Sequence, residues 1–306
     1  SLNLGENFDT SNVTDMQYMF NETGYKAMTS LNLGENFDTS NVTNMPGMFL
    51  GTGHKAMTSL DLGENFDTRN VTDMRVMFSE TGYTAMTSLD LGDKFDTSNV
   101  TNMNEMFLDT GYTAMTILDL GDKFDTSNVT EMMLMFGLTG FESMTSLDLG
   151  DKFDTSNVST TGRMFYGTGF TAMTSLDLGD KFNTRNVTDM QEMFNGTGFT
   201  AMTSLDLGPA FTHIPDGEVQ DGQETVKAYK DLIIACGAPG AVIYAPEAIY
   251  QNSTNLKLGT DSTTTIQYSD YDIENDQILD TPRGKIIPKY RTEWLKEGTT
   301  IDTSNT

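Results

Sequence analysis

Residues 175–203, SLDLGDKFNTRNVTDMQEMFNGTGFTAMT, are one copy of a pattern that fills about two thirds of the 306-residue chain. The motif that opens this copy, Ser-Leu-Asx-Leu-Gly, recurs every 29 residues without insertion or deletion. Its copies start at Ser1, Ser30, Ser59, Ser88, Ile117, Ser146, Ser175 and Ser204. Because a fixed repeat length requires every copy to follow the same backbone path, the copies are predicted to stack as a solenoid.

Each copy divides into a strand, a turn, a short helix and a return. The alternation in Leu176-Asp177-Leu178 predicts a strand with its leucines inward and Asp177 outward. Downstream, the apolar residues at 187, 190, 193 and 194 have helical spacing, Thr188 is a suitable N-cap, and the glycines at 196 and 198 end the segment. The sequence therefore predicts an α/β solenoid with a parallel strand ladder and short helices.

The repeated apolar residues are predicted to form the core. In the strand ladder, one inward column is expected to hold Leu2, Leu31, Leu60 and Leu89. The methionines, among them Met16, Met19 and Met28, lie at core spacing between Leu and Phe positions. We interpret them as flexible fillers of gaps between stacked turns, not as copper or cofactor ligands.

Two segments of the copy carry a resemblance to a known family. MTSLDLGDKF at 86–95 resembles the strand segment of a leucine-rich repeat. FDTSNVTDMQYMF at 8–20 and FDTSNVTNMNEMF at 95–107 resemble the Met- and Phe-rich repeats of BspA-like bacterial surface proteins. The likeness covers residues 1 to about 211. It implies a right-handed, leucine-rich-repeat-like superhelix, an extracellular location on a bacterial cell, and a role in adhesion without catalytic residues.

The chain departs from that pattern at the asparagine position of the leucine-rich repeat. Asn7, Asn36 and Asn65 occupy it in the first copies, and lysines replace them at 94, 123, 152 and 181. A buried asparagine ladder cannot run through this position. The invariant asparagine that begins at Asn12 and recurs to Asn186 is the alternative candidate. Copy six also departs, since Thr161 stands where the other copies have methionine.

Charge and cysteine content restrict the partners. The formal net charge of −26 repels phosphate backbones and anionic lipids, so nucleic acid and simple membrane-surface partners are disfavoured, and a cationic partner is favoured. The alternative is that the charge only keeps a long repeat array soluble. Cys236 is the only cysteine and is interpreted as a buried apolar residue. No apolar stretch is long enough for a membrane span, no signal peptide opens the chain, and the start in mid-pattern at Ser1 suggests a fragment of a longer protein.

Composition changes near residue 209 and gives three expected parts. Residues 1–208 hold seven repeats and the start of an eighth, 209–250 form a cap, and 251–306 form a small β extension or linker. Within the cap, residues 218–236 are predicted to form an amphipathic helix and Ala241–Tyr244 a last strand. Further strands are expected at 263–268 and 285–287, and the only tryptophan is Trp294.

The strongest candidate binding surface is the outward strand position, which is acidic in six consecutive copies. This column holds Asp61, Asp90, Asp119, Asp148, Asp177 and Asp206. On a parallel ladder its carboxylates lie about 5 Å apart, which costs free energy unless they are solvated or neutralised. We therefore expect either a site for a basic protein or Ca²⁺, or a solvated face. Nearby Asp-Lys pairs such as Asp93-Lys94 weaken the Ca²⁺ alternative.

Other site types find less support in the residues. No set of His, Cys or carboxylate residues has zinc spacing, and no acid/base pair stands out. We therefore expect the chain to have no metal site, no cofactor and no enzymatic activity. His54 replaces Tyr or Phe of other copies, which favours a packing role, and His213 stands alone. Threonine columns beginning at Thr10 and Thr23 offer ice binding as an alternative, although caps and turns explain them equally well.

The function expected from these residues is non-catalytic recognition. The chain is predicted to be a bacterial cell-surface adhesion or protein-interaction module whose partner is a host or neighbouring-cell surface protein or glycan. Ice binding and a Ca²⁺-dependent structural solenoid are the alternatives. The first copies would contribute Asn3 and Asn32 to the outward column in place of aspartate.

Overall fold

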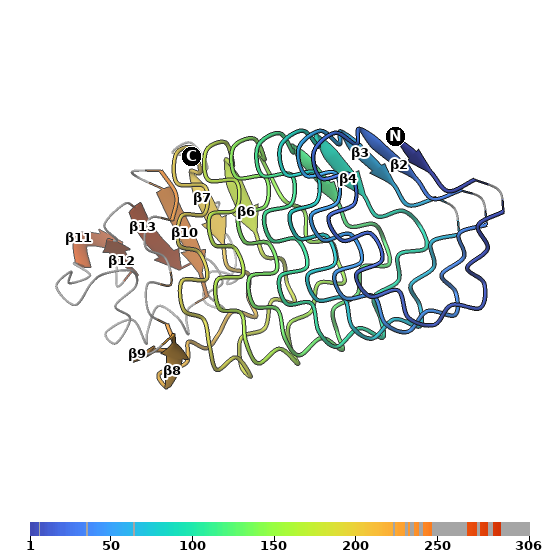
Figure 1. Cartoon of the computed structure of the whole chain (residues 1–306). Coiled ribbons are helices and arrows are strands. Elements are labelled where there is room, and N and C mark those ends of the chain that lie inside the picture. The colour runs from blue at the N-terminus through green and yellow to red at the C-terminus, as the bar shows by residue number, and fades with distance from the viewer. Residues whose placement is uncertain are drawn as a thin grey trace, which may run out of the picture.

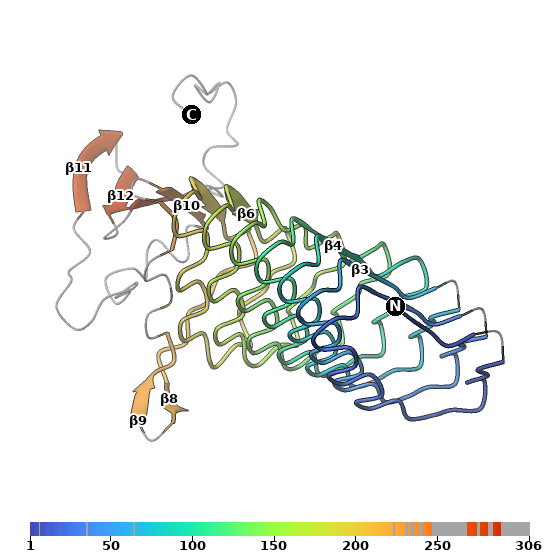
Figure 2. The same cartoon turned by 45° about the horizontal axis from the view of Figure 1, so that its top comes forward.

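The computed structural model is a parallel β-solenoid in which each 29-residue copy makes one turn (Figure 1). It describes residues 1–5, 7–34, 36–63, 65–222, 224–229, 232, 236–238, 241–246, 268–273, 276–280 and 284–288. About seven turns follow one another along a single axis, and the turned view shows the same coil from another side (Figure 2). The predicted stacking of equal copies is confirmed.

One strand per turn builds the ladder. The strands of the repeats are β1 (Leu2–Asn3), β2 (Ser30–Asn32), β3 (Ser59–Asp61), β4 (Ser88–Asp90), β5 (Ile117–Asp119), β6 (Ser175–Asp177) and β7 (Ser204–Asp206). Within the sheets β1–β3, β4–β5 and β6–β7, neighbouring strands pair in parallel and in register, so Leu2 faces Leu31, Leu31 faces Leu60, and Leu89 faces Leu118. The predicted inward leucine column is confirmed for Leu31, Leu60 and Leu89, which are buried, whereas Leu2 in the first turn is exposed. The ladder is interrupted between β3 and β4 and again in the sixth copy, where residues 146–148 do not form a regular strand.

The helices predicted for each copy are wrong, because the described residues contain none. In the fourth copy, the amides of Met103, Glu105 and Phe107 donate to carbonyls of the next turn. The intervening amides close i to i−3 turns, such as Met106 to Met103. Glu105 and Asp109 have φ of 58° and 59°, in the left-handed region, which no continuous right-handed helix tolerates. The fold is therefore all β and turn, not α/β.

The interior consists of stacked columns of identical side chains. Phe37, Phe66 and their equivalents stack with ring centroids 6.0–6.5 Å apart. Phe49, Phe78 and theirs stack at 5.4–5.6 Å. Leucine, valine and methionine columns fill the rest, nearly all of them buried. Thr161, which replaces methionine in copy six, is also buried and keeps the interturn bond from its amide to the Asp189 carbonyl (2.9 Å).

Hydrogen bonds between side chains and backbone tie successive turns together. Each buried threonine of the Thr52 column donates to a phenylalanine carbonyl of the previous turn, as Thr110 does to Phe78 at 2.7 Å. The asparagine column also forms a ladder, since Asn99 Nδ2 donates to the Arg69 carbonyl at 2.7 Å and its equivalents repeat the bond. The alternative asparagine ladder is thus present, although it lies on the exposed surface and not in the core.

The segment after the repeats continues the coil, and the described residues among 218–236 do not form the predicted helix. Residues expected to be helical form the antiparallel hairpin β8 (Glu218–Asp221) and β9 (Glu224–Lys227). The amides of Met190 and Phe194 donate to the carbonyls of Ala228 and Leu232, so the chain past the hairpin stacks on the last repeat. The helix prediction missed the hairpin because Val219 and Val226, taken as one helical face, are opposite each other across two strands.

The strand ladder extends into the C-terminal part. The last strand predicted at 241–244 is confirmed as β10 (Ala241–Ala245), which pairs in parallel with β7. Beyond it lie β13 (Gly284–Pro288), β12 (Asp276–Asp280) and β11 (Tyr268–Ile273) in the same sheet. The strand expected at 285–287 lies within β13, whereas of 263–268 only Tyr268 is described, at the start of β11. Trp294 lies outside the described residues.

Candidate functional site

The outward strand position forms an exposed acidic column over most of the solenoid. Register pairing places Asp61 beside Asn32, Asp119 beside Asp90, and Asp206 beside Asp177. Five of the six predicted aspartates are exposed. Asp206 is 7 % exposed because β10 lies beside it, with Tyr244 as its partner across the ladder. Asp206 is therefore not part of the exposed column, which comprises Asp61, Asp90, Asp119, Asp148 and Asp177.

A local hydrogen bond explains why this position is always Asp or Asn. In each copy the Oδ1 atom accepts a bond from the amide of the glycine two residues later, as Asp119 does from Gly121 at 3.0 Å. Asn3 and Asn32 make the same bond at 2.9 and 2.8 Å. The turn therefore requires the acceptor oxygen but not the negative charge. Charge at the five exposed positions is a feature of the surface and not a requirement of the fold.

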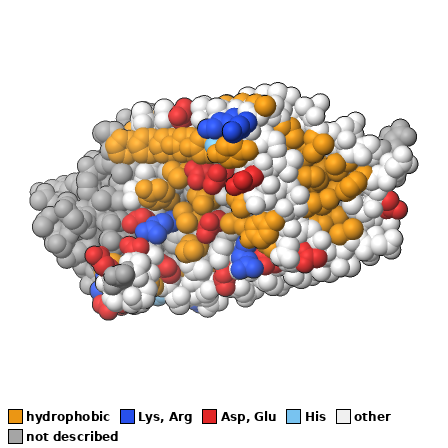
Figure 3. Space-filling view, in the orientation of Figure 1, with side chains coloured by type: hydrophobic (Ala, Val, Ile, Leu, Met, Phe, Trp, Pro, Cys, Tyr) orange, Lys and Arg blue, Asp and Glu red, His pale blue; other side chains and the backbone are white. Residues whose placement is uncertain are grey.

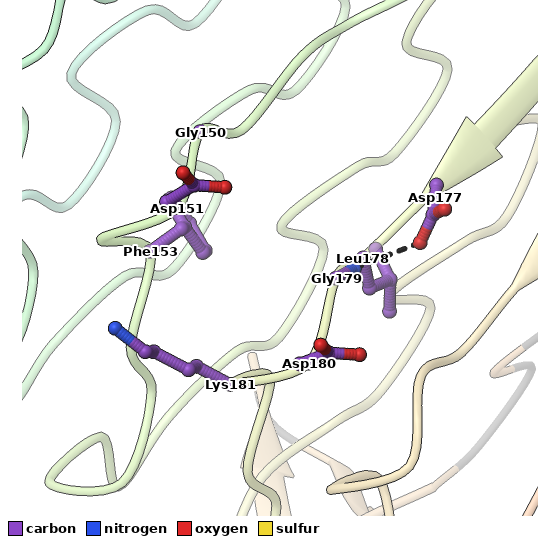
Figure 4. A pocket seen from close by; sticks show the side chains of 8 residues that line it. All are labelled: Gly150, Asp151, Phe153, Asp177, Leu178, Gly179, Asp180 and Lys181. Atoms are coloured by element: carbon purple, nitrogen blue, oxygen red, sulfur yellow. Dashed lines mark hydrogen bonds between the residues drawn. The ribbon is translucent and has the colours of Figure 1, made fainter.

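The column borders a hollow between the sixth and seventh turns. This hollow has a volume of about 460 Å³ and is lined by Asp151, Phe153, Asp177, Asp180 and Lys181, together with backbone at 150 and 178–179. Figure 4 shows Asp177 bonded to the Gly179 amide, and the Lys181 side chain extending toward the loop that carries Asp151. A neighbouring hollow of about 420 Å³ adds Asp148 to the lining. Four carboxylates and one ammonium group thus surround a surface recess.

The threonine columns proposed for ice binding lie inside the solenoid. From Thr39 onward, the Thr10 column is almost fully buried and donates to carbonyls of the next turn, as Thr39 does to Asp67 at 2.9 Å. The Thr23 column is buried from Thr52 onward and bonded in the same manner to the previous turn. These buried hydroxyls donate hydrogen bonds between adjacent turns. Neither column therefore forms the flat external array on which the ice-binding alternative rested.

Sequence reasoning missed a second surface, which we call the aromatic stripe. Its members are Tyr25, His54, Tyr83, Tyr112, Phe141, Phe170 and Phe199. Successive rings stack face to face with centroids 4.4–4.7 Å apart. All are half-buried except His54, whose packing role between Tyr25 and Tyr83 is confirmed. An aromatic residue at one position of all seven copies was the available signal.

Two carboxylates adjoin this stripe on successive turns. Glu80 and Asp109 occupy the same position of the third and fourth copies, both with left-handed φ. Burial, followed by the charge of Glu80, raises the pKa of Asp109 to about 6. The Nε2 atom of His54 lies 3.5 Å from a Glu80 carboxylate oxygen, and burial lowers the pKa of the imidazole despite that neighbour.

No group of three or more His, Cys, Asp or Glu side chains in the described part of the chain is arranged to hold a metal ion. Among the same residues, no helix is long and apolar enough to cross a membrane.

Fold and surface define a class: a β-solenoid repeat protein with an acidic ladder on its strand face and an aromatic stripe elsewhere. Two overlapping segments, residues 2–110 and 81–204, match the family described as Mycoplasma protein of unknown function, DUF285. Together the matches cover most of the repeat region, and the chain belongs to this family. Neither the curated proteins nor the solved structures contain a match.

Proposed function

We propose that this chain is a non-catalytic recognition module of a bacterial cell surface, with an adhesive role. Its partner is a surface protein or glycan of a host or neighbouring cell. The extracellular location rests on the resemblance of segments such as 8–20 to the repeats of BspA-like surface proteins. The recognition surface is the exposed acidic column, together with the hollows that Asp148 and Asp177 help to line.

The observation that supports this proposal is that the outward strand position is negatively charged in five exposed copies, although the fold does not require the charge. Asn3 and Asn32 make the same turn bond as the aspartates, yet five later copies carry exposed carboxylates in line. Like charges on adjacent strands are unfavourable for folding. A partner that supplies cationic or hydrogen-bond donor groups offsets that cost only when it is bound, and the field of the column raises its rate of encounter.

The test removes charge and keeps shape. A variant with Asp90→Asn, Asp119→Asn, Asp148→Asn and Asp177→Asn retains each bond to the glycine amide. Arrays of matrix proteins and glycans, probed with the unaltered chain, supply a ligand for affinity measurements at several salt concentrations. We expect the variant to bind more weakly and with a flatter salt dependence, because exposed charges are screened beyond about 8 Å at physiological ionic strength.

A second variant with the same change in net charge serves as the control. Asp38, Asp96, Asp125 and Asp154 accept bonds from the amide two residues later at another corner of the coil, and Asn183 already does so in the seventh copy. Their replacement by Asn should leave affinity nearly unchanged. Equal losses in both variants would reduce the effect to net charge, and no loss in either would remove the column from recognition.

A further inference from the structure

The aromatic stripe is a continuous apolar band on the surface. Figure 3 shows hydrophobic side chains running along the solenoid, with acidic side chains gathered against one edge of the band and basic side chains at the other. Half-buried rings present their edges to solvent, because their faces are stacked on one another. Ring edges carry partial positive charge and do not attract cations, so any cation binding here depends on the adjoining carboxylates.

Those carboxylates are poorly neutralised by the described residues. The side chain of Asp109 is half-buried and makes no hydrogen bond or ion pair there, and its neighbour one turn earlier is the like-charged Glu80. The 3.5 Å contact between Glu80 and His54 is too long for a strong hydrogen bond. The imidazole is itself buried, and its Nδ1 atom has no partner. Polar groups left in this state cost free energy that a bound donor would recover.

We propose that the aromatic stripe docks a cationic amphipathic segment of a partner protein. Apolar side chains of the segment lie along Tyr83, Tyr112 and Phe141, and a Lys or Arg side chain reaches Glu80 and Asp109. The site is built from other repeat positions than the acidic column, since each stripe residue precedes the next outward strand position by seven residues, as Tyr83 precedes Asp90, and it does not include that column.

Charge selects this occupant over others. A second copy of the chain, with its net charge of −26, is repelled, and so are anionic lipids and nucleic acids. A purely apolar partner would desolvate Asp109 further without neutralising it. A purely cationic partner would leave the rings exposed to water. Only a partner with both chemistries satisfies both features of the surface.

The titratable and charged groups around Asp109 decide how binding depends on pH. They are Glu80, Tyr83, Tyr112 and Glu142, with His54 and Lys55 beyond Glu80. Burial raises the pKa of both tyrosines, so they stay neutral near pH 7. Since the pKa of Asp109 is about 6, its carboxylate is charged at pH 7.5 and largely protonated at pH 5. Binding of a cationic segment should therefore weaken as pH falls through about 6.

The probe is a synthetic amphipathic peptide of lysine and leucine, compared with an oligolysine of equal charge. Calorimetric titration at pH 7.5 should give tighter binding for the amphipathic peptide. Glu80→Gln combined with Asp109→Asn should weaken that binding about tenfold, the loss expected for one charge-assisted contact. Asp90→Asn combined with Asp119→Asn, with the same change in net charge on the strand face, should have little effect. Asp109→Asn alone should flatten the pH dependence.

A further variant tests the apolar half of the surface. Leu138 occupies the position of Glu80 and Asp109 in the next turn, beside the stripe. It has a left-handed φ of 55° and is half-buried, and asparagine is well tolerated in this conformation. Leu138→Asn should weaken binding of the amphipathic peptide and leave the affinity for oligolysine unchanged. Thermal melts establish that each variant is folded. Equal affinity for both peptides, or equal losses in the Glu80/Asp109 and Asp90/Asp119 variants, would overturn the proposal and reduce binding to the general field of the protein. Neither outcome bears on the strand face, which is tested with its own ligand.

Discussion

At the scale of single residues, the outward aspartates have two roles that the sequence alone did not separate. The alternation Leu-Asp-Leu correctly placed them outside the core, but the pattern gave no sign of the hydrogen bond that the amide of the following glycine donates to the carboxylate. If relief of like-charge repulsion were the only effect, Asp119→Ala would be neutral or slightly stabilising. The bond changes this expectation.

Two substitutions at Asp119 separate charge from hydrogen bonding. Asp119→Asn keeps the acceptor for the Gly121 amide and relieves repulsion with Asp90, so stability should stay the same or rise slightly. Asp119→Ala removes the acceptor and should cost about 0.5–1 kcal/mol. Chemical denaturation of the three proteins measures the difference. Equal stability of the Ala and Asn variants would show that the bond contributes nothing.

Asp109 gives a prediction about pH and stability. Its pKa of about 6 in the folded protein exceeds the ordinary value of 3.8, so the folded state binds this proton more tightly than the unfolded state. The favourable contribution is complete below about pH 3.8 and is lost as pH rises through 6. Asp109→Asn should therefore stabilise the protein at pH 7.5 by about 1 kcal/mol, after allowance for solvent screening. Melting temperatures from pH 4 to 8 should converge at the acid end; a constant gap would contradict the assignment.

At the scale of elements, the strand was predictable and the turn segment was not. Leucines two residues apart specify a strand because alternate side chains share a face. Met103, Met106 and Phe107 have helical spacing, yet a chain of tight turns also points them inward. What distinguishes the two is left-handed backbone at Glu105 and Asp109, and neither residue type reveals it. The available signal was glycine at the equivalent positions of other copies: Gly47 and Gly51 in the second copy, Gly167 in the sixth and Gly196 in the seventh.

The residues with left-handed backbone give a stability prediction whose sign would be opposite if these segments were helices. Val76 has φ of 50°, which is costly for a β-branched residue, and Gly47 occupies the same position one turn earlier. Val76→Gly should stabilise the chain by about 0.5–1 kcal/mol, whereas in a helix it would destabilise by a similar amount. Gly140→Ala should have the opposite effect, because a Cβ there would lie 2.5 Å from the Cβ of Met144. Thermal melts give the sign of each change, and a loss of stability in Val76→Gly would restore the helical alternative.

The leucine columns should behave as a packed core. Leu120 is 4 % exposed in a central turn, with leucines of the neighbouring turns above and below. Leu120→Ala should cost about 2–5 kcal/mol, as other large-to-small core changes do. Its outward neighbour Asp119 provides the matched comparison, with a loss of about 1 kcal/mol or less. Similar losses at both positions in denaturant titrations would contradict the inward and outward assignment.

At the scale of the whole molecule, strict periodicity made the solenoid predictable, and its loss made the end unpredictable. Copies of equal length can share hydrogen bonds only by following one another in register. After residue 208 no such constraint exists, and a hairpin was mistaken for a helix. Arg163 of the sixth copy forms ion pairs with Glu192 of the seventh copy at 2.8 Å and with Asp221 of the hairpin at 3.1 Å. These contacts join residues 29 and 58 positions apart, beyond any local pattern.

Spin-label distances along the strand face test the central claim, that each repeat is one turn of a parallel β-solenoid. In a Cys236→Ser background, one label stays at Ser30 and a second moves to Ser88, Ser146 or Ser175, which are two, four and five repeats away. Parallel strands are about 4.8 Å apart, so the separation should be about 10, 19 and 24 Å between backbones and should rise evenly with repeat number. An increase of about 8–10 Å per repeat, the distance between packed helices, or no regular increase at all, would contradict the β-solenoid.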